Sequence, residues 1–172
     1  MVFIAVAVLR ITNTDYEAYS ILRDTIGNIA AITIICGGLL RSWAGGCIMK
    51  NKALMTTGPY HLCRNPLYLG SFMIAMGFAV ILRDVMLWAM FVTFFLMYIP
   101  TIKAEEQKLA RLFPDEFSAY IKATGILFPK SFSLKKLKSH WSLKRWWQNT
   151  EYNAMIAIIV AFTIIEYLWA KP

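Results

Sequence analysis

Long apolar runs constrain the fold of this chain more than any other feature of its sequence. Four of them are about 17 or 18 residues long, the short end of what a helix needs to cross a bilayer: 26–43, 66–82, 85–102 and 154–170. Because backbone polar groups in lipid must be satisfied within the segment, each run predicts a helix. A shorter run at 2–11 is interpreted as a truncated or tilted helix, or as a signal-like core. The sequence therefore predicts an all-α, multi-pass integral membrane bundle of about five transmembrane helices.

Composition agrees with a membrane protein. Hydrophobic residues make up 58% of the chain and charged residues 16%, whereas soluble domains carry roughly 25% charged residues. The net charge of +8 favours cytoplasmic loops and anionic lipid headgroups over nucleic acid, because Lys and Arg lie beside the apolar runs. The three cysteines show no C-x-x-C spacing, so no disulfide framework and no metal site are predicted. Cys63 is interpreted as a small buried side chain.

The distribution of basic residues predicts the orientation. If the amino terminus is cytoplasmic and all five runs cross, the inside loops are 41–66 and 103–153, and they hold fourteen of the eighteen Lys and Arg residues. Such an asymmetry is typical of cytoplasmic loops. We therefore expect a multi-pass membrane protein whose active site faces the cytoplasm. It would lie in the inner membrane of a prokaryote or in the endoplasmic reticulum of a eukaryote.

The stretch TTGPYHLCRNPLYLG, residues 56–70, gathers polar and conformationally special residues between two apolar runs. Proline at a first helical position with asparagine before it is a typical helix start, so the helix of run 66–82 is predicted to begin at Pro66 with Asn65 as its cap. Its first amides carry partial positive charge, and Arg64 adds a full one. This combination suits a carboxylate or a phosphate.

The residues on either side of that helix start support a site. A Gly58–Pro59 turn is expected to bring Tyr60 and His61 back over the helix start. Tyr68 and Gly70 fall in the first turns, and Gly70 shares a face with Gly77, which permits close approach of another helix or of a ligand.

A second polar island, Glu105–Glu106, follows run 85–102, and Pro100 can bend the helix just before it. Only Arg83 and Asp84 separate the two runs, so an antiparallel hairpin is predicted. The hairpin makes the two polar islands neighbours. One island offers a cation and helix amides and the other offers two carboxylates, which matches a ligand that carries both a carboxylate and a positive charge.

Residues 103–153 form the long non-spanning region. The fourth helix is expected to continue to about residue 113. A short amphipathic helix then starts near Pro114, with Asp115 as a plausible cap and Phe117, Tyr120 and Ile121 on one face, and it ends at Pro129. The basic and aromatic stretch KSFSLKKLKSHWSLKRWWQN predicts an interfacial segment, with a disordered basic loop as the alternative.

Two motifs carry a resemblance to a known family. GPYHLCRNPLYLG and EEQKLARLFPDEFSAYIKATGILFP resemble the two linked signatures of the isoprenylcysteine carboxyl methyltransferase and phospholipid methyltransferase superfamily of integral membrane enzymes. The resemblance covers about residues 56–129. It divides the single membrane domain, 1–172, into amino-terminal helices (1–55), a methyltransferase core (56–129), a basic interfacial segment (130–153) and an extra transmembrane helix (154–170).

The resemblance implies that S-adenosylmethionine binds at the cytoplasmic ends of these helices. The positions that match the motifs are Gly58, Tyr60, Arg64, Asn65, Pro66, Tyr68, Gly70, Glu105 and Glu106, and His61 joins them as a cofactor-binding residue and a possible base. Arg64, Glu105 and Glu106 are the expected catalytic residues. Arg64 or the helix amides would hold the methionine carboxylate, one glutamate would face the ammonium, and the tyrosine rings suit adenine or the sulfonium.

Three departures separate this chain from the family pattern. Asn65 stands where many members have histidine, Phe113–Pro114 replaces Phe-Gly, and the chain continues beyond Pro129. Without a histidine base at position 65, a carboxylate acceptor is slightly favoured, because it is ionised already and needs no base.

The predicted function is therefore S-adenosylmethionine-dependent methylation of an amphiphilic acceptor that enters from the bilayer, most plausibly the carboxylate of a prenylcysteine. Three alternatives stay open. They are a phospholipid N-methyltransferase, an NADPH-dependent membrane reductase of the sterol type, and a non-catalytic membrane protein that binds anionic lipid through its basic segment.

Overall fold

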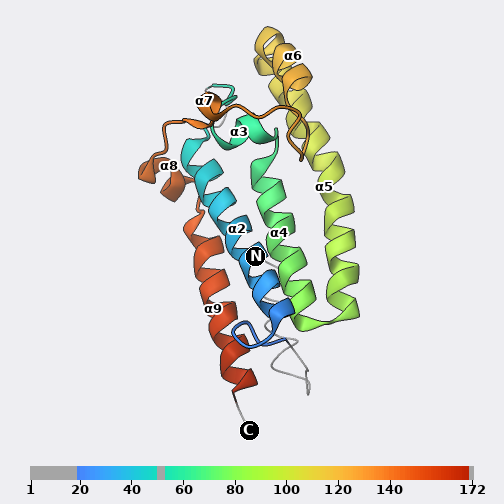
Figure 1. The fold of residues 1–172 in the computed structure, drawn as a ribbon. Helices are drawn as coiled ribbons and strands as arrows, with labels where there is room; N and C mark the ends of the chain where they lie inside the picture. The colour runs from blue at the N-terminus through green and yellow to red at the C-terminus, as the bar shows by residue number, and fades with distance from the viewer. Residues whose placement is uncertain (1–18, 50–52, 171–172) are drawn as a thin grey trace. The chain divides into compact units, whose positions relative to one another are not determined.

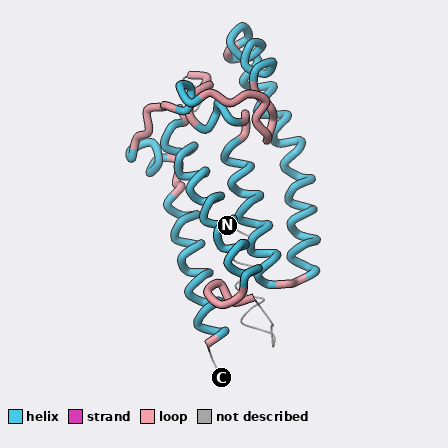
Figure 2. The backbone as a smooth tube through the Cα atoms, in the orientation of Figure 1, coloured by secondary structure: helices cyan, strands magenta, loops and turns pink. Residues whose placement is uncertain are grey.

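The computed structural model describes residues 19–49 and 53–170, and they form helices and connecting loops without a strand (Figures 1 and 2). The predicted all-α class is confirmed for this part of the chain. The run at 2–11 lies outside the described residues. The helices are α2 (Thr25–Cys47), α3 (Pro59–Leu62), α4 (Pro66–Leu82), α5 (Val85–Leu112), α6 (Pro114–Ala123), α7 (Leu134–Leu137), α8 (Leu143–Gln148) and α9 (Tyr152–Trp169).

Two of the described helices are long and apolar enough to cross a membrane, namely α2 and the stretch Leu87–Leu112 of α5. Two more apolar helices, Pro66–Leu82 and Tyr152–Tyr167, are shorter. All four coincide with the predicted runs, because a long apolar sequence favours helix wherever its side chains can be buried or face lipid. Helix α2 does so although it contains Gly37, Gly38 and Arg41. A count of about five spans stays a prediction.

The reversal between α4 and α5 is as tight as the sequence predicts. Arg83 adopts a left-handed backbone conformation, with φ of 51°, which is uncommon outside glycine and typical of sharp turns. Asp84 is buried, and its Oδ1 accepts a hydrogen bond from the backbone N–H of Leu87 at 3.4 Å, in the first turn of α5. A carboxylate at a helix start satisfies an amide that the helix itself leaves without a partner.

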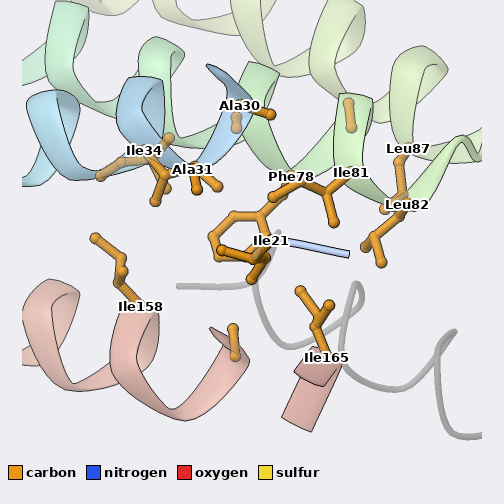
Figure 3. Packing of buried hydrophobic residues seen from close by; sticks show 14 residues of the cluster. Ile21, Ala30, Ala31, Ile34, Phe78, Ile81, Leu82, Leu87, Ile158 and Ile165 are labelled. Atoms are coloured by element: carbon orange, nitrogen blue, oxygen red, sulfur yellow. The ribbon is translucent and has the colours of Figure 1, made fainter. Parts of the chain in front are cut away.

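The chain divides into two compact units. The first contains residues 19–39, 70–95 and 152–170 among those described, and the second contains Leu40–Leu69 and Leu96–Glu151. Helices α2, α4 and α5 contribute residues to both units. The first unit holds the larger apolar core, which is centred on Ile34, Phe78, Ile81 and Ile165 from α2, α4 and α9 (Figure 3).

Small residues let α2 and α4 approach closely in the first unit. A Cβ built on Gly77 would lie 2.8 Å from the carbonyl oxygen of Ala30 and would overlap the side chain of Ile34, and one built on Gly37 would lie 2.7 Å from the carbonyl oxygen of Gly70. The close approach expected along the Gly70 and Gly77 face is thus a contact between two helices.

Two expectations about α6 are wrong. Its cap is Phe113, with Pro114 at the first helical position, so Asp115 lies inside the first turn and does not cap the helix. A proline at the first helical position fixes the backbone for the helix start, so the cap is the residue before it, two positions earlier than predicted. The helix also ends at Ala123, with Thr124 in an extended conformation, rather than at Pro129. The predicted apolar face exists, but Phe117 and Tyr120 are buried within the protein.

Gly77→Ala tests the helix contact. Alanine in place of a helical glycine ordinarily stabilises by about 0.5–1 kcal/mol. At Gly77 we expect the opposite, a loss of about 1–3 kcal/mol, because the backbone oxygen of Ala30 cannot move aside cheaply. The measurement is the thermal unfolding midpoint of the detergent-purified protein. Gly38→Ala is the matched control, since its Cβ meets only flexible side-chain tips of Ile158 and Met155. A midpoint of Gly77→Ala at or above that of the control would contradict the contact.

Candidate functional site

Arg64 joins three segments of the second unit through four side-chain hydrogen bonds. Its Nε donates to Glu106 Oε1 at 2.7 Å and its Nη2 donates to Glu106 Oε2 at 3.4 Å. Its Nη1 donates to the carbonyl oxygens of Ile121 at 3.2 Å and Thr124 at 2.8 Å. The pairing with Glu106 is bidentate, and both side chains are largely shielded, with 10% and 21% of their surface exposed. Such charge-assisted pairs are among the strongest polar contacts in proteins. We refer to this set of contacts as the Arg64 fork.

Asn65 and the backbone around it reinforce the Arg64 fork. Asn65 Nδ2 donates to Glu106 Oε1 at 3.4 Å and to the carbonyl oxygen of Ile126 at 3.3 Å. The backbone N–H groups of Arg64 and Asn65 donate to the carbonyl oxygens of Gly125 and Ile126, at 2.9 and 3.2 Å. The first motif is therefore fastened both to the end of α5 and to the loop that follows α6.

Tyr68 and Glu105 form a second, exposed contact. The hydroxyl of Tyr68 donates to Glu105 Oε1 at 2.9 Å. The ring of Tyr68 meets the ring of Tyr98 edge to face, with centroids 4.7 Å apart. This arrangement places a carboxylate beside two aromatic rings, and both kinds of group attract a cation.

The turn before the helix start is built as its sequence indicates. Gly58 has φ of 63° and precedes α3, a conformation that glycine adopts without strain. The ring of Tyr60 packs in a buried cluster with Ala44 and Cys47 at the end of α2, and its backbone carbonyl accepts a hydrogen bond from the hydroxyl of Tyr120 at 2.7 Å. Burial raises the pKa of the Tyr60 hydroxyl well above its usual value, with further contributions from Tyr120 and Cys47, so this phenol stays protonated.

His61 and Cys63 are also buried. Within the described part of the chain, no hydrogen-bond partner lies within reach of His61 Nε2. Burial raises the pKa of the Cys63 thiol to about 11, despite a backbone hydrogen bond from Asn65 that lowers it. A thiol with that pKa is almost wholly protonated at neutral pH and is a poor nucleophile, which agrees with the interpretation of Cys63 as a packing residue.

The structure thus brings together five of the sequence-predicted site residues in two contacts. Arg64 and Asn65 meet Glu106, and Tyr68 meets Glu105. Pro66 is fully buried where α4 begins. Tyr60 and His61 are buried within the second unit rather than exposed beside the glutamates. Gly70 belongs to the first unit.

Sequence reasoning missed the partners that α6 and its following loop supply. The acceptors are main-chain carbonyl oxygens, and because every residue has one, the sequence does not indicate which of them accept a hydrogen bond. The available signal was Gly125, because glycine shortly after a helix commonly marks its end. A Cβ on Gly125 would overlap the carbonyl oxygen of Phe128, so the tight loop that presents the carbonyls of Gly125 and Ile126 to the first motif depends on this glycine. Tyr98 was missed because it lies inside an apolar run.

Comparison with known proteins identifies the family of this chain. Residues 27–116, more than half of the chain, match the family described as phospholipid methyltransferase. That span contains the first motif, the hairpin and the beginning of the second motif, residues 105–116. The chain belongs to the phospholipid methyltransferase family, which is part of the integral membrane methyltransferase superfamily.

Two relatives are named for resistance to metals. The chain is 37% identical over 95 residues to the cobalt-zinc-cadmium resistance protein CzcN of Cupriavidus metallidurans. The matched segment covers 55% of this chain and 43% of the relative. It is 39% identical over 82 residues to the nickel-cobalt-cadmium resistance protein NccN of Alcaligenes xylosoxydans xylosoxydans. Here the matched segment covers 47% of this chain and 38% of the relative. The chain therefore spans less than half the length of these curated relatives. No solved structure matches it.

Arg64→Lys tests the Arg64 fork. A lysine ammonium keeps the charge but cannot reach Glu106 and both carbonyl oxygens at once. We expect a loss of about 1–3 kcal/mol, because buried acceptors are left without donors. This corresponds to a fall of roughly 3–10 °C in the thermal unfolding midpoint. Arg111→Lys, at an exposed position near the end of α5, is the matched control. Equal midpoints for the two variants would show that the fork does not hold the unit together.

Proposed function

We propose that this chain is an S-adenosylmethionine-dependent methyltransferase that acts on an amphiphilic acceptor from the bilayer. The observation that carries the proposal is the pairing of the two family motifs, in which Arg64 and Asn65 meet Glu106 while Tyr68 meets Glu105. Membership of the phospholipid methyltransferase family supports the same reaction class.

The two glutamates receive different roles in this proposal. Glu106 is already neutralised by the Arg64 fork and fixes the local geometry. Glu105 is exposed and has only a neutral hydroxyl on one oxygen, so it keeps its charge available for a cation such as the ammonium of the methionyl group. The rings of Tyr68 and Tyr98 next to Glu105 would favour a sulfonium or stack against adenine.

Arg64 acts as a positioning residue in this account. Four of its hydrogen bonds are made within the protein, so we assign the methionine carboxylate to the first amides of α4, where the helix carries partial positive charge. We keep Gly58, Tyr60, His61, Pro66 and Gly70 as residues that shape the site. Gly58, Tyr60 and His61 form the turn before α4, and Pro66 fixes the start of α4.

When bound, S-adenosylmethionine supplies an electrophilic methyl group on a sulfonium. The residues of this chain contribute orientation, which is worth about 7–11 kcal/mol in well-aligned reactions, and a low-dielectric surrounding that favours the disappearance of charge. Glu105 can accept the proton of a protonated amine acceptor, either directly or through water.

The acceptor that we favour is the amine headgroup of a phospholipid. The earlier preference for the carboxylate of a prenylcysteine depended on the missing histidine at position 65. That position is occupied here by an asparagine that ties Glu106 to Ile126, and Glu105 offers a base instead. The family match supports a phospholipid acceptor and gives no support to prenylcysteine. The names of the two metal-resistance relatives specify no methyl acceptor.

The proposal includes the predicted topology, with the motif face toward the cytoplasm. Its support is the sequence, since fourteen of the eighteen Lys and Arg residues fall in the two expected inside loops. The two long apolar helices are consistent with a membrane location.

Glu105→Gln tests the cofactor site. In calorimetry on the purified protein in detergent, we expect S-adenosylhomocysteine to bind the wild type and to bind Glu105→Gln about 10- to 100-fold more weakly, because a charge-assisted contact is lost. Glu116→Gln, at an exposed position of α6, should bind as the wild type does. Binding of NADPH alone would favour the reductase alternative. Binding of neither ligand would favour the non-catalytic one.

The acceptor is tested by methyl transfer in reconstituted vesicles. With radiolabelled S-adenosylmethionine, we expect label in phosphatidylethanolamine, and Glu105→Gln should reduce the rate by about 10- to 100-fold, since an amine needs a base. A farnesylcysteine derivative serves as the competing substrate. Label in that compound, with none in the phospholipid, would restore the carboxylate assignment and leave the cofactor site standing.

A further inference from the structure

A continuous stretch of the second unit contains basic and apolar residues but no acidic one. Residues 126–148, which we call the basic strap, lie between Glu116 and Glu151, and neither Asp nor Glu occurs from 117 to 150. The cationic residues of the basic strap are Lys130, Lys135, Lys136, Lys138, Lys144 and Arg145. All five lysines are exposed.

Hydrogen bonds from donors of the basic strap to carbonyl groups of α2 hold the basic strap to the end of that helix. The last four carbonyl groups of an α-helix have no partner within the helix. In α2, the carbonyl of Gly46 accepts from the Ser142 N–H at 2.9 Å and that of Cys47 accepts from Arg145 Nη1 at 3.1 Å. Just beyond the basic strap, Asn149 Nδ2 donates to the carbonyl of Gly45 at 2.8 Å.

The basic strap is also tied to the turn of the first motif. The N–H of Gly58 donates to the carbonyl oxygen of Lys136 at 2.8 Å. The hydroxyl of Ser139 lies 3.0 Å from Cys47 Sγ, and a Cβ on Gly58 would overlap Ser139. Two larger side chains of the basic strap also bond to the protein, since Lys130 Nζ donates to the carbonyl oxygen of Ile121 at 3.2 Å and Trp141 Nε1 donates to that of Ser42 at 3.1 Å. The other four lysines stay exposed.

Several large apolar side chains of the basic strap are exposed. Phe128, Phe132, Leu134, Leu143 and Trp147 are between 61% and 75% exposed. Leu143 and Trp147 line a shallow surface hollow together with Lys144 and Gln148. Exposed aromatic and aliphatic side chains interleaved with lysines are unfavourable in water alone and match the boundary between lipid headgroups and acyl chains.

We infer that the basic strap docks on an anionic phospholipid surface. Its apolar side chains enter the headgroup boundary while its lysines contact lipid phosphates. The charge argues for anionic rather than zwitterionic lipid, since lysines held near a negatively charged leaflet are attracted additively and no acidic residue of the strap opposes them. This inference concerns binding to a surface and does not depend on methyl transfer.

The experiment compares the full-length protein in nanodiscs of phosphatidylcholine with that in nanodiscs containing about one third phosphatidylglycerol. Chymotrypsin cleavage after the aromatic and leucine residues of the basic strap is followed by mass spectrometry. We expect cleavage to be roughly tenfold to a hundredfold slower with the anionic lipid. Raising the salt concentration to about 1 M should remove most of this protection, because the screening length falls to about 3 Å.

A charge variant and a matched control complete the test. Lys135→Gln, Lys136→Gln and Lys144→Gln together should be cleaved equally fast in both lipids, while the wild-type thermal midpoint is retained. The control carries Lys103→Gln, Lys108→Gln and Arg111→Gln on α5, loses the same charge and should keep the protection. Equal cleavage of the wild type in both lipids overturns the inference. So does equal protection in phosphatidylcholine by soluble glycerophosphoglycerol, which would indicate a phosphate pocket rather than a surface.

Discussion

The Arg64 fork is the interaction on which the second unit depends. It joins residues 42 and 60 positions apart in the chain, and its acceptors are the carboxylate of Glu106 and the carbonyl oxygens of Ile121 and Thr124. Removing one partner of such a pair is costly because the other remains buried and charged. The fork therefore fixes where the start of α4, the end of α5 and the loop after α6 lie with respect to one another.

The fork also decides which charges are available to a ligand. Sequence reasoning treated Arg64 and the two glutamates as free charges that together would hold a zwitterion. In the structure Arg64 and Glu106 form an ion pair, whereas Glu105 is exposed and accepts a hydrogen bond from Tyr68. In the function that we propose, Glu106 therefore helps to build the site, and Glu105 supplies the negative charge that a cofactor or an amine would meet.

The sequence predicted the parts of the fold that depend on apolar length and on short-range chemistry. The four described runs are helices, α4 begins at Pro66, and the two residues Arg83 and Asp84 reverse the chain, because apolar length, proline geometry and connection length each restrict the backbone directly. The adjacency of the two motifs followed from that hairpin. The end of α6 and the carbonyl acceptors of Arg64 could not be predicted, since main-chain acceptors depend on where a distant loop is placed.

The basic strap shows the same limit in another form. Its composition predicts contact with a membrane surface, but not that it caps a helix 96 to 98 residues away. This capping gives the strap a fixed position that is independent of lipid. A segment already ordered by the protein loses less conformational entropy when it meets a bilayer than a flexible loop does. The contacts that satisfy the end of α2 therefore also position the exposed lysines and aromatic side chains of the basic strap to bind a surface. A separate hydrogen bond, from the N–H of Gly58 to the carbonyl oxygen of Lys136, ties the basic strap to the turn of the first motif.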